Sequence, residues 1–106
     1  MKRGDLVTVA VSGDYGKPRP ALVVQADAFD EHPSVVVLPL TSEIHDTPLF
    51  RVAVTPSRRT GLRKSSQIMV DKATAVPRVK LGRRIGSVDA ATLNAVNEAL
   101  RGFLGL

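Results

Sequence analysis

Two places in the chain combine residue types that could act on a phosphate group. Arg19 lies between Pro18 and Pro20, so its backbone is stiff and its guanidinium is presented from a defined point. Thr41 and Ser42 end an apolar run, and hydroxyls at such a position can bind a phosphate oxygen or cap a turn. A permanently charged guanidinium suits a phosphate or the phosphorane that forms when it reacts. The pattern alone leaves open a surface arginine and turn-capping hydroxyls.

Asp71 is the remaining candidate for chemistry. It follows the apolar triplet 68–70 and is one of only three acids in residues 51–106, so it could balance arginines structurally or position a hydroxyl. The chain has no phosphate-binding loop, dinucleotide fingerprint, zinc-protease motif or nucleophile elbow. Cysteine is absent and only two histidines occur, both in polar stretches. We therefore expect no metal and no cofactor.

The charge is divided unevenly along the chain. Residues 1–50 hold four Lys or Arg and seven acids, which gives −3, whereas residues 51–106 hold eleven and three, which gives +8. Such clustering suggests a polyanion or an acidic protein as partner, with a solvated basic face as the alternative. Only four residues are aromatic, so a nucleic-acid site would rely on arginine and backbone contacts more than on stacking.

Elements that could position these residues follow from the apolar pattern. The 106 residues, 43% of them hydrophobic, fit a single domain, 1–106. Runs rich in β-branched residues, separated by Gly and Pro turns, predict six or seven strands, at 6–11, 21–25, 34–41, 50–54, 66–70, 73–76 and 84–88. Pro39 lacks a ladder donor, so we expect it at an edge, bulge or bend.

The C-terminal segment changes to helical periodicity. An apolar stripe spaced i, i+3, i+7 and i+10 comprises Leu93, Val96, Leu100 and Phe103. Ser87 or Asp89 could cap the helix, and Gly105 suits its end. The sequence thus predicts a β-dominated α+β fold, a small antiparallel barrel or twisted sheet with a C-terminal helix. The longest apolar runs have four residues, so we expect no membrane span, no signal peptide and a cytoplasmic protein.

Several blocks of the sequence carry a family resemblance that spans essentially the whole chain. They are KRGDLV (2–7), GKPRPALVV (16–24), LPLTS (38–42), SQIMVD (66–71), Ile85-Gly86, the helical stripe and LGL (104–106). In this order and spacing the chain resembles the MazF/PemK toxins of bacterial toxin–antitoxin systems. The arginine–proline block and the PLTS block at the right distance are the most specific parts.

The resemblance implies a homodimer of SH3-like barrels that cleaves single-stranded RNA without metal. The 2′-hydroxyl of the RNA would be the nucleophile, leaving a 2′,3′-cyclic phosphate and a 5′-hydroxyl. The catalytic arginine and threonine of the family fall on Arg19 and Thr41, with Ser42 beside them and Asp71 assisting. The loop 12–18 would close over the RNA, and its glycines would supply flexibility.

RNA contacts and partners also follow from the resemblance and the basic charge. The expected RNA-binding residues are Lys17, Gln25, Lys72, Arg83 and Arg84. An acidic antitoxin would inhibit the toxin, and DNA would be reached only through that antitoxin. Two departures matter: some relatives carry arginine two residues before the acid, where this chain has Met69, and many carry glutamine where it has Lys72. The first puts an arginine–acid catalytic pair in doubt.

Two other functions remain as alternatives. A gyrase-poisoning toxin would share the architecture, but that branch is associated with a tryptophan near the end of the helix, and this chain has none. A catalytically silent barrel that binds nucleic acid or protein is the third class. Cleavage of a long single-stranded RNA in EDTA separates the nuclease from both.

Overall fold

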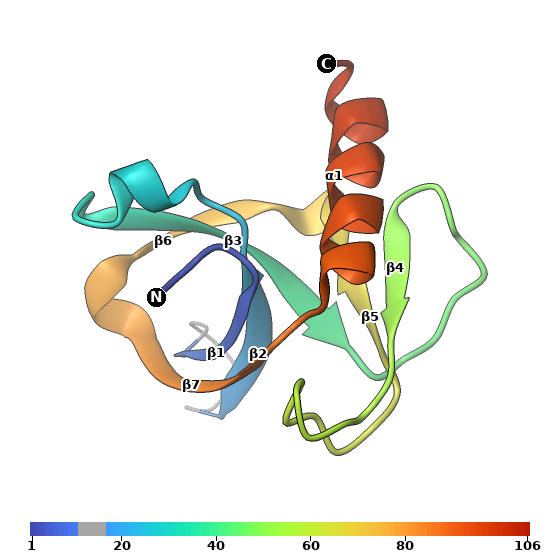
Figure 1. The fold of residues 1–106 in the computed structure, drawn as a ribbon, viewed down its shortest axis with the longest axis horizontal. Coiled ribbons are helices and arrows are strands. Elements are labelled where there is room, and N and C mark those ends of the chain that lie inside the picture. Colours follow the sequence, from blue (N-terminus) through green and yellow to red (C-terminus); the bar gives the residue numbers. More distant parts are fainter. Residues whose placement is uncertain (11–16) are drawn as a thin grey trace.

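The structure is a computed structural model that describes residues 1–10 and 17–106, and it consists of one curved sheet and one terminal helix (Figure 1). The strands are β1 (Asp5–Ala10), β2 (Pro18–Val23), β3 (Ser34–Thr41), β4 (Arg51–Val54), β5 (Ser66–Met69), β6 (Thr74–Pro77) and β7 (Leu81–Ser87). The helix is α1 (Ala90–Leu104), and the short 3-10 turns are η1 (Asp27–Phe29), η2 (Val70–Lys72) and η3 (Arg78–Lys80). The predicted β-dominated α+β fold is confirmed.

Every strand pairing is antiparallel. The strand order is β4-β5-β3-β2-β1-β7, and β6 pairs with β3 off this path. Across residues 1–10 and 17–106, the terminal strands β4 and β7 do not pair with each other. The predicted barrel is therefore an open, strongly curved sheet rather than one closed by hydrogen bonds.

Pro39 lies where β3 changes partners along one edge. Residues 34–37 of β3 pair with β6, whereas Leu40 and Thr41 pair with β5. A proline cannot donate to a ladder, so it fits the gap between the two pairings. Pro39 also pairs with Ala21 of β2, so it lies inside the sheet rather than at an outer edge, and the hydroxyl-bearing end of β3 lies just beyond it.

The two faces of the sheet bury two separate apolar clusters, because side chains alternate along a strand. Leu6, Leu22 and Leu38 lie side by side in β1, β2 and β3 and face α1. Their neighbours one position along contribute to a second cluster on the opposite face, composed of Val7, Val9, Ala21, Val23, Val35 and Val37. Burial on both faces fixes the strand register, since a one-residue slip would exchange the two sets.

The helix α1 closes the first cluster. Val96 is fully buried, and Phe103 at the outer end of the predicted stripe contacts the ring of Phe50 at a centroid distance of 6.1 Å. Asp89, rather than Ser87, caps the helix by accepting a hydrogen bond from the backbone of Thr92. Gly105 ends it with φ of 73°. In the described part of the chain no helix is long and apolar enough to cross a membrane.

Candidate active site

Arg19 and Thr41 lie on neighbouring strands, each two residues beyond the last pair of the β2–β3 ladder. That ladder ends with Ala21 opposite Pro39, and Thr41 pairs with Gln67 of β5. Steps of two keep side chains on one face of a sheet, so both residues lie on the face opposite α1. The strand β2 begins at Pro18, so Arg19 belongs to the strand itself rather than to the turn expected before it.

A hollow of about 310 Å³ lies on this face beside Arg19. Its walls come from β1, β2, β3 and the segment that contains β6 and η3. They include Arg19, Pro39, Thr74 and Lys80. Arg19 is exposed and Thr41 is half-buried, so both remain accessible to a ligand. Most of the lining is apolar, and Arg19 and Lys80 are its two cationic residues; either can bind an anion such as a phosphate.

Hydrogen bonds hold the segment after Thr41 at two points. The Thr41 hydroxyl accepts a hydrogen bond from the backbone N–H of Glu43 at 3.1 Å. Gln67, the partner of Thr41 in the β3–β5 ladder, donates to the carbonyl of His45 at 2.6 Å and accepts from its N–H at 3.1 Å. The side chains of Ser42 and of the next four residues are exposed. An exposed segment is thus held beside Thr41 by one buried amide.

Asp71, in η2, forms a two-point ion pair with Arg51 of β4. Nε of Arg51 donates to Oδ1 at 2.9 Å, and Nη2 donates to Oδ2 at 3.3 Å. The two side chains are 11% and 21% exposed, respectively. The hydrogen bond from Arg51 lowers the pKa of the Asp71 carboxyl, against the opposing effect of burial. Asp71 is therefore ionised at neutral pH and can only accept hydrogen bonds.

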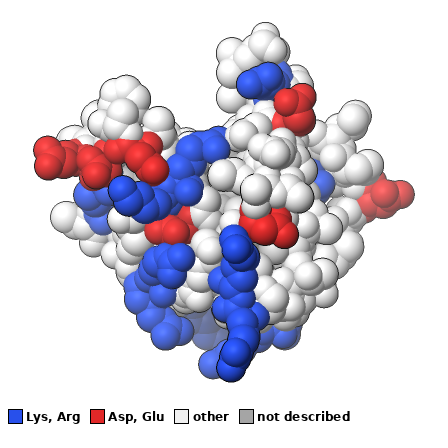
Figure 2. Space-filling model, in the orientation of Figure 1, with Lys and Arg blue, Asp and Glu red and all other residues white. Residues whose placement is uncertain are grey.

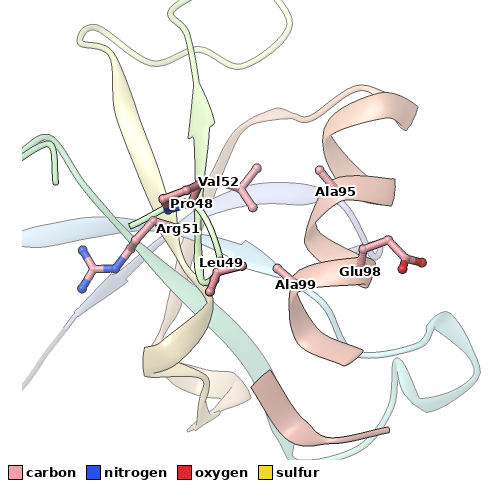
Figure 3. Close-up of a pocket in the computed structure, with 7 residues that line it drawn as sticks. All are labelled: Pro48, Leu49, Arg51, Val52, Ala95, Glu98 and Ala99. Atoms are coloured by element: carbon pink, nitrogen blue, oxygen red, sulfur yellow. The ribbon is translucent and has the colours of Figure 1, made fainter. Parts of the chain in front are cut away.

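Arg51 pairs with Asp71 from β4, whereas some relatives of the resembled family were expected to carry their arginine at the position of Met69. Arg51 stands directly opposite Met69 in the β4–β5 ladder, so the guanidinium reaches Asp71 from the neighbouring strand. Figure 3 shows Val52 pointing toward α1 and Arg51 pointing away from it. Arg51 therefore lies on the same side of the sheet as Arg19 and Thr41. Nothing local in the sequence marked it, because 20 residues separate it from Asp71.

The predicted RNA-binding residues separate into two groups. Lys17, Lys72 and Arg83 are exposed. Arg84 is ion-paired with the buried Asp5 at 3.0 Å, although its side chain is 54% exposed. Gln25 follows the far end of β2, and its side chain binds the backbone of Phe29, Ser34 and Val36. The structure therefore does not bring Gln25 to Arg19.

Basic side chains are prominent in one region of the surface. In Figure 2 several occupy the lower half of the face, which in Figure 1 holds β7 and the β4–β5 connection, and others lie at the upper left and at the top. That connection carries Arg58, Arg59, Arg63 and Lys64, all exposed. The loop expected to close over RNA, 12–18, falls mostly outside the described residues. Within residues 1–10 and 17–106, no three acidic or histidine side chains gather as a metal site would require.

An apolar groove of about 450 Å³ lies on the other side, between β4 and α1 (Figure 3). Pro48, Leu49, Arg51 and Val52 form one wall, and Ala95, Glu98 and Ala99 form the other, so the mostly apolar lining also includes two charged residues. Leu49 is 84% exposed. The groove is separate from the face that carries Arg19 and Thr41, and its lining is suited to a protein surface rather than to a phosphate.

Comparison with known proteins agrees with this geometry. Residues 2–104 match the family described as PemK-like, MazF-like toxin of type II toxin-antitoxin system. A protein of Mycolicibacterium smegmatis named "Probable endoribonuclease MazF" is 44% identical over 100% of this chain and 98% of its own length. Endoribonuclease EndoA of Bacillus subtilis is 27% identical over 100% of this chain and 96% of its own.

Solved structures give the same result. An endoribonuclease in complex with its cognate antitoxin from a mycobacterial species superposes with a TM-score of 0.85 at 29% identity, covering 100% of this chain and 96% of that one. The MazE-MazF structure (Form-II) from Deinococcus radiodurans gives 0.81 at 25% identity, covering 100% and 96%. The prediction of an endoribonuclease toxin is confirmed by the family and by the names of these relatives. The chain belongs to the PemK-like, MazF-like toxins of type II toxin–antitoxin systems.

Proposed function

We propose that this MazF-like endoribonuclease toxin cleaves single-stranded RNA without a metal ion, with Arg19 and Thr41 at the scissile phosphate. The observation that supports the proposal is the antiparallel pairing of β2 with β3 up to Ala21 and Pro39, because Arg19 and Thr41 lie just beyond that pair on the two strands and Arg19 lines a hollow. An arginine and a hydroxyl so arranged can hold two different oxygens of one phosphodiester.

The reaction needs no group that the protein lacks. The 2′-oxygen of the RNA forms a bond to phosphorus, and the bond from phosphorus to the 5′-oxygen breaks. The proton of the 2′-hydroxyl passes to solvent and solvent supplies a proton to the 5′-oxygen, so the products are a 2′,3′-cyclic phosphate and a 5′-hydroxyl. Because the nucleophile is part of the substrate, the protein must align it and stabilise the charge of the phosphorane.

Each site residue then has a defined role. Arg19 stabilises the phosphorane charge through its guanidinium fork, and the Thr41 hydroxyl orients a phosphate oxygen. Ser42 offers a second hydroxyl next to Thr41. Asp71, held ionised by Arg51, is suited to position a hydroxyl rather than to donate a proton.

RNA binding draws on the exposed basic residues around this face. Lys17 immediately precedes β2, and Lys72 immediately follows Asp71. Each can therefore contact a phosphate near the scissile one. Arg83 and Arg84 extend the basic surface along β7, with the charge of Arg84 partly neutralised by Asp5. The geometry supports a contact from Gln25 least, because backbone groups already engage its amide.

An acidic antitoxin and a second copy of the chain are the partners that fit this surface. The +8 charge of residues 51–106 offers a target for an acidic, partly disordered segment that folds as it binds. The relatives solved with an antitoxin support this. The apolar groove between β4 and α1 supports a homodimer, and two copies would provide a longer RNA track. Such a toxin would act in the cytoplasm, where its RNA is.

Cleavage of a long single-stranded RNA in EDTA tests the proposal. The parent should cut, whereas Arg19→Ala and Thr41→Ala should each cut on the order of 10²-fold more slowly, the usual cost of losing a transition-state donor. Both variants should keep the melting temperature of the parent, because neither side chain lies in the apolar core. Parent-like cleavage by Arg19→Ala would show that the site is elsewhere.

A further inference from the structure

We propose that His45 is a further catalytic residue of this toxin, whose imidazolium donates a proton to the 5′-oxygen as that oxygen leaves phosphorus. The inference rests on the proposed function, because it requires a scissile phosphate beside Arg19 and Thr41. It gives to a side chain one of the two proton transfers that would otherwise fall to solvent.

The charged residues already placed at the site cannot supply this proton. Arg19 keeps its proton at any pH below about 12, and Asp71, held ionised by Arg51, can only accept hydrogen bonds. A positioned side chain that transfers a proton accelerates a reaction by about 10²–10⁴-fold. Imidazole is the side chain that ordinarily changes charge between pH 5 and 8, so a histidine beside Thr41 is suited to this step.

Two links hold His45 next to Thr41. Gln67 stands directly opposite Thr41 in the β3–β5 ladder, so both side chains lie on the same face, and the Gln67 amide binds the N–H and the carbonyl of His45. The Thr41 hydroxyl also accepts a hydrogen bond from the N–H of Glu43, and Oε1 of Glu43 lies 3.8 Å from Nε2 of His45. The backbone of His45 is thus held from β5 and its ring is paired from the Thr41 side.

The surroundings of the ring favour a proton donor. The His45 side chain is 53% exposed, so a phosphodiester can reach it. The Glu43 carboxylate and an incoming phosphate both attract an imidazolium more strongly than a neutral ring. Because an imidazolium carries a proton on each nitrogen, Nδ1 can face the substrate while Nε2 pairs with Glu43.

Other charged groups lie on the same segment and on the elements packed around it. Asp46 is the next residue in the chain. The neighbouring elements contribute the cations Arg19 of β2 and Lys72 of η2, the uncharged Gln67 of β5, and the pair of Arg51 with Asp71, whose charges offset each other.

The step needs no further reagent. The 2′-hydroxyl loses its proton to solvent, the 2′-oxygen bonds to phosphorus, and the bond from phosphorus to the 5′-oxygen breaks. As this bond breaks, Nδ1 of His45 gives its proton to the 5′-oxygen, which leaves as a hydroxyl. The neutral ring then takes a proton from solvent.

An RNA with sulfur in place of the scissile 5′-oxygen tests this role, because a thiol is far more acidic than an alcohol and the thiolate leaves without a proton. Single-turnover cleavage of ordinary RNA and sulfur RNA is measured in EDTA for the parent and His45→Gln. On ordinary RNA near pH 6, His45→Gln should be about 10²-fold slower than the parent. On sulfur RNA the two rates should agree within about threefold.

The pH dependence is a second readout that a structural role would not move. The parent carries the imidazolium at low pH and loses it as pH rises through the imidazole range. The ratio of the parent rate to the His45→Gln rate on ordinary RNA should therefore be largest near pH 6 and fall toward one above about pH 8. On sulfur RNA the ratio should stay close to one at both pH values.

Two variants serve as controls. His32→Gln replaces the other histidine, which accepts a hydrogen bond from the N–H of Ser34; Ser34 begins β3 and Thr41 ends it, about 20 Å away. Arg3→Met loses a guanidinium that donates to Val24 and Asn97 on the α1 side, and so reports the effect of lost stability away from the site. Both should cut each RNA at the parent rate.

Two results would overturn the inference. One is a His45→Gln variant that cuts ordinary RNA like the parent. The other is an equal deficit on ordinary and sulfur RNA, since His45 would then act through binding or folding. Failure of the proposed function is a separate result, because it appears as ordinary RNA that the parent leaves uncut in EDTA or that Arg19→Ala cuts like the parent.

Discussion

The buried amide of Gln67 predicts a coupling between one side chain and the cleavage site. Gln67 is 7% exposed, and both of its polar atoms bind the backbone of His45. Gln67→Met removes two hydrogen bonds at nearly constant volume. At about 0.5–1.5 kcal/mol for each bond, the free energy of unfolding should fall by about 1–3 kcal/mol. Since the segment is exposed and can rehydrate after release, we expect the lower half of that range.

The functional effect should be larger than the effect on stability suggests. Release of His45 frees the segment that begins at Thr41, so the hydroxyl is no longer held in place and the rate at saturating RNA should fall about tenfold or more. Urea unfolding and cleavage are measured on the parent, Gln67→Met and Arg3→Met. Arg3→Met should lose stability without losing rate. If Gln67→Met is destabilised as expected but cleaves like Arg3→Met, the segment does not position Thr41.

Further predictions concern stability, pH and salt. The pKa of Asp71 is lower in the folded chain than its unfolded value near 3.8, because Arg51 donates a hydrogen bond to the carboxylate. Its contribution to stability is therefore complete above the unfolded pKa and is lost as pH falls through the folded one. Parent and Asp71→Asn should differ in urea unfolding at neutral pH, and the difference should shrink as pH falls below the unfolded pKa. A Cβ on Gly86 would lie 2.3 Å from two backbone oxygens, whereas one on Gly102 meets nothing within 4 Å. Gly86→Ala should therefore lower the free energy of unfolding by about 1–3 kcal/mol, and Gly102→Ala should raise it by up to about 1 kcal/mol. A stabilising Gly86→Ala or a destabilising Gly102→Ala would contradict the packing seen around these two glycines. Replacing Arg83 and Arg84 together by Glu should reduce the slope of log affinity against log salt by about 1 or more, and an unchanged slope would put the RNA track near 58–64.

The local pattern of apolar residues was sufficient to predict the strands and the helix. The strand at 34–41 has the predicted bounds, and the helical stripe is buried at Val96 as its spacing requires. The bounds of β2 were less accurate, because Pro18 and Pro20 were assigned to a turn. Both prolines lie in the strand and continue its ladder with β1, since a proline can keep extended backbone where no donor is needed.

The site was predicted in part. Thr41 and Asp71 stood out because they follow apolar runs, and Arg19 because it lies between two prolines before one; the structure places Arg19 on β2 and Thr41 on the neighbouring strand β3. Arg51 and Gln67 could not be found this way, because their importance depends on contacts across strands that only the register creates. The predicted RNA contact of Gln25 is not supported, because its amide binds backbone groups across a turn. These contacts depend on the fold and could not be predicted from the sequence.

The chemical identity of the cleaved ends tests the central claim most directly. A single-stranded RNA is incubated with the protein in EDTA, and both new ends are determined. The 2′-hydroxyl mechanism at Arg19 and Thr41 predicts a 2′,3′-cyclic phosphate on one fragment and a 5′-hydroxyl on the other, with no cutting where the scissile ribose is replaced by deoxyribose. Fragments with a 5′-phosphate and a 3′-hydroxyl, or cutting that requires a divalent metal ion, would contradict it.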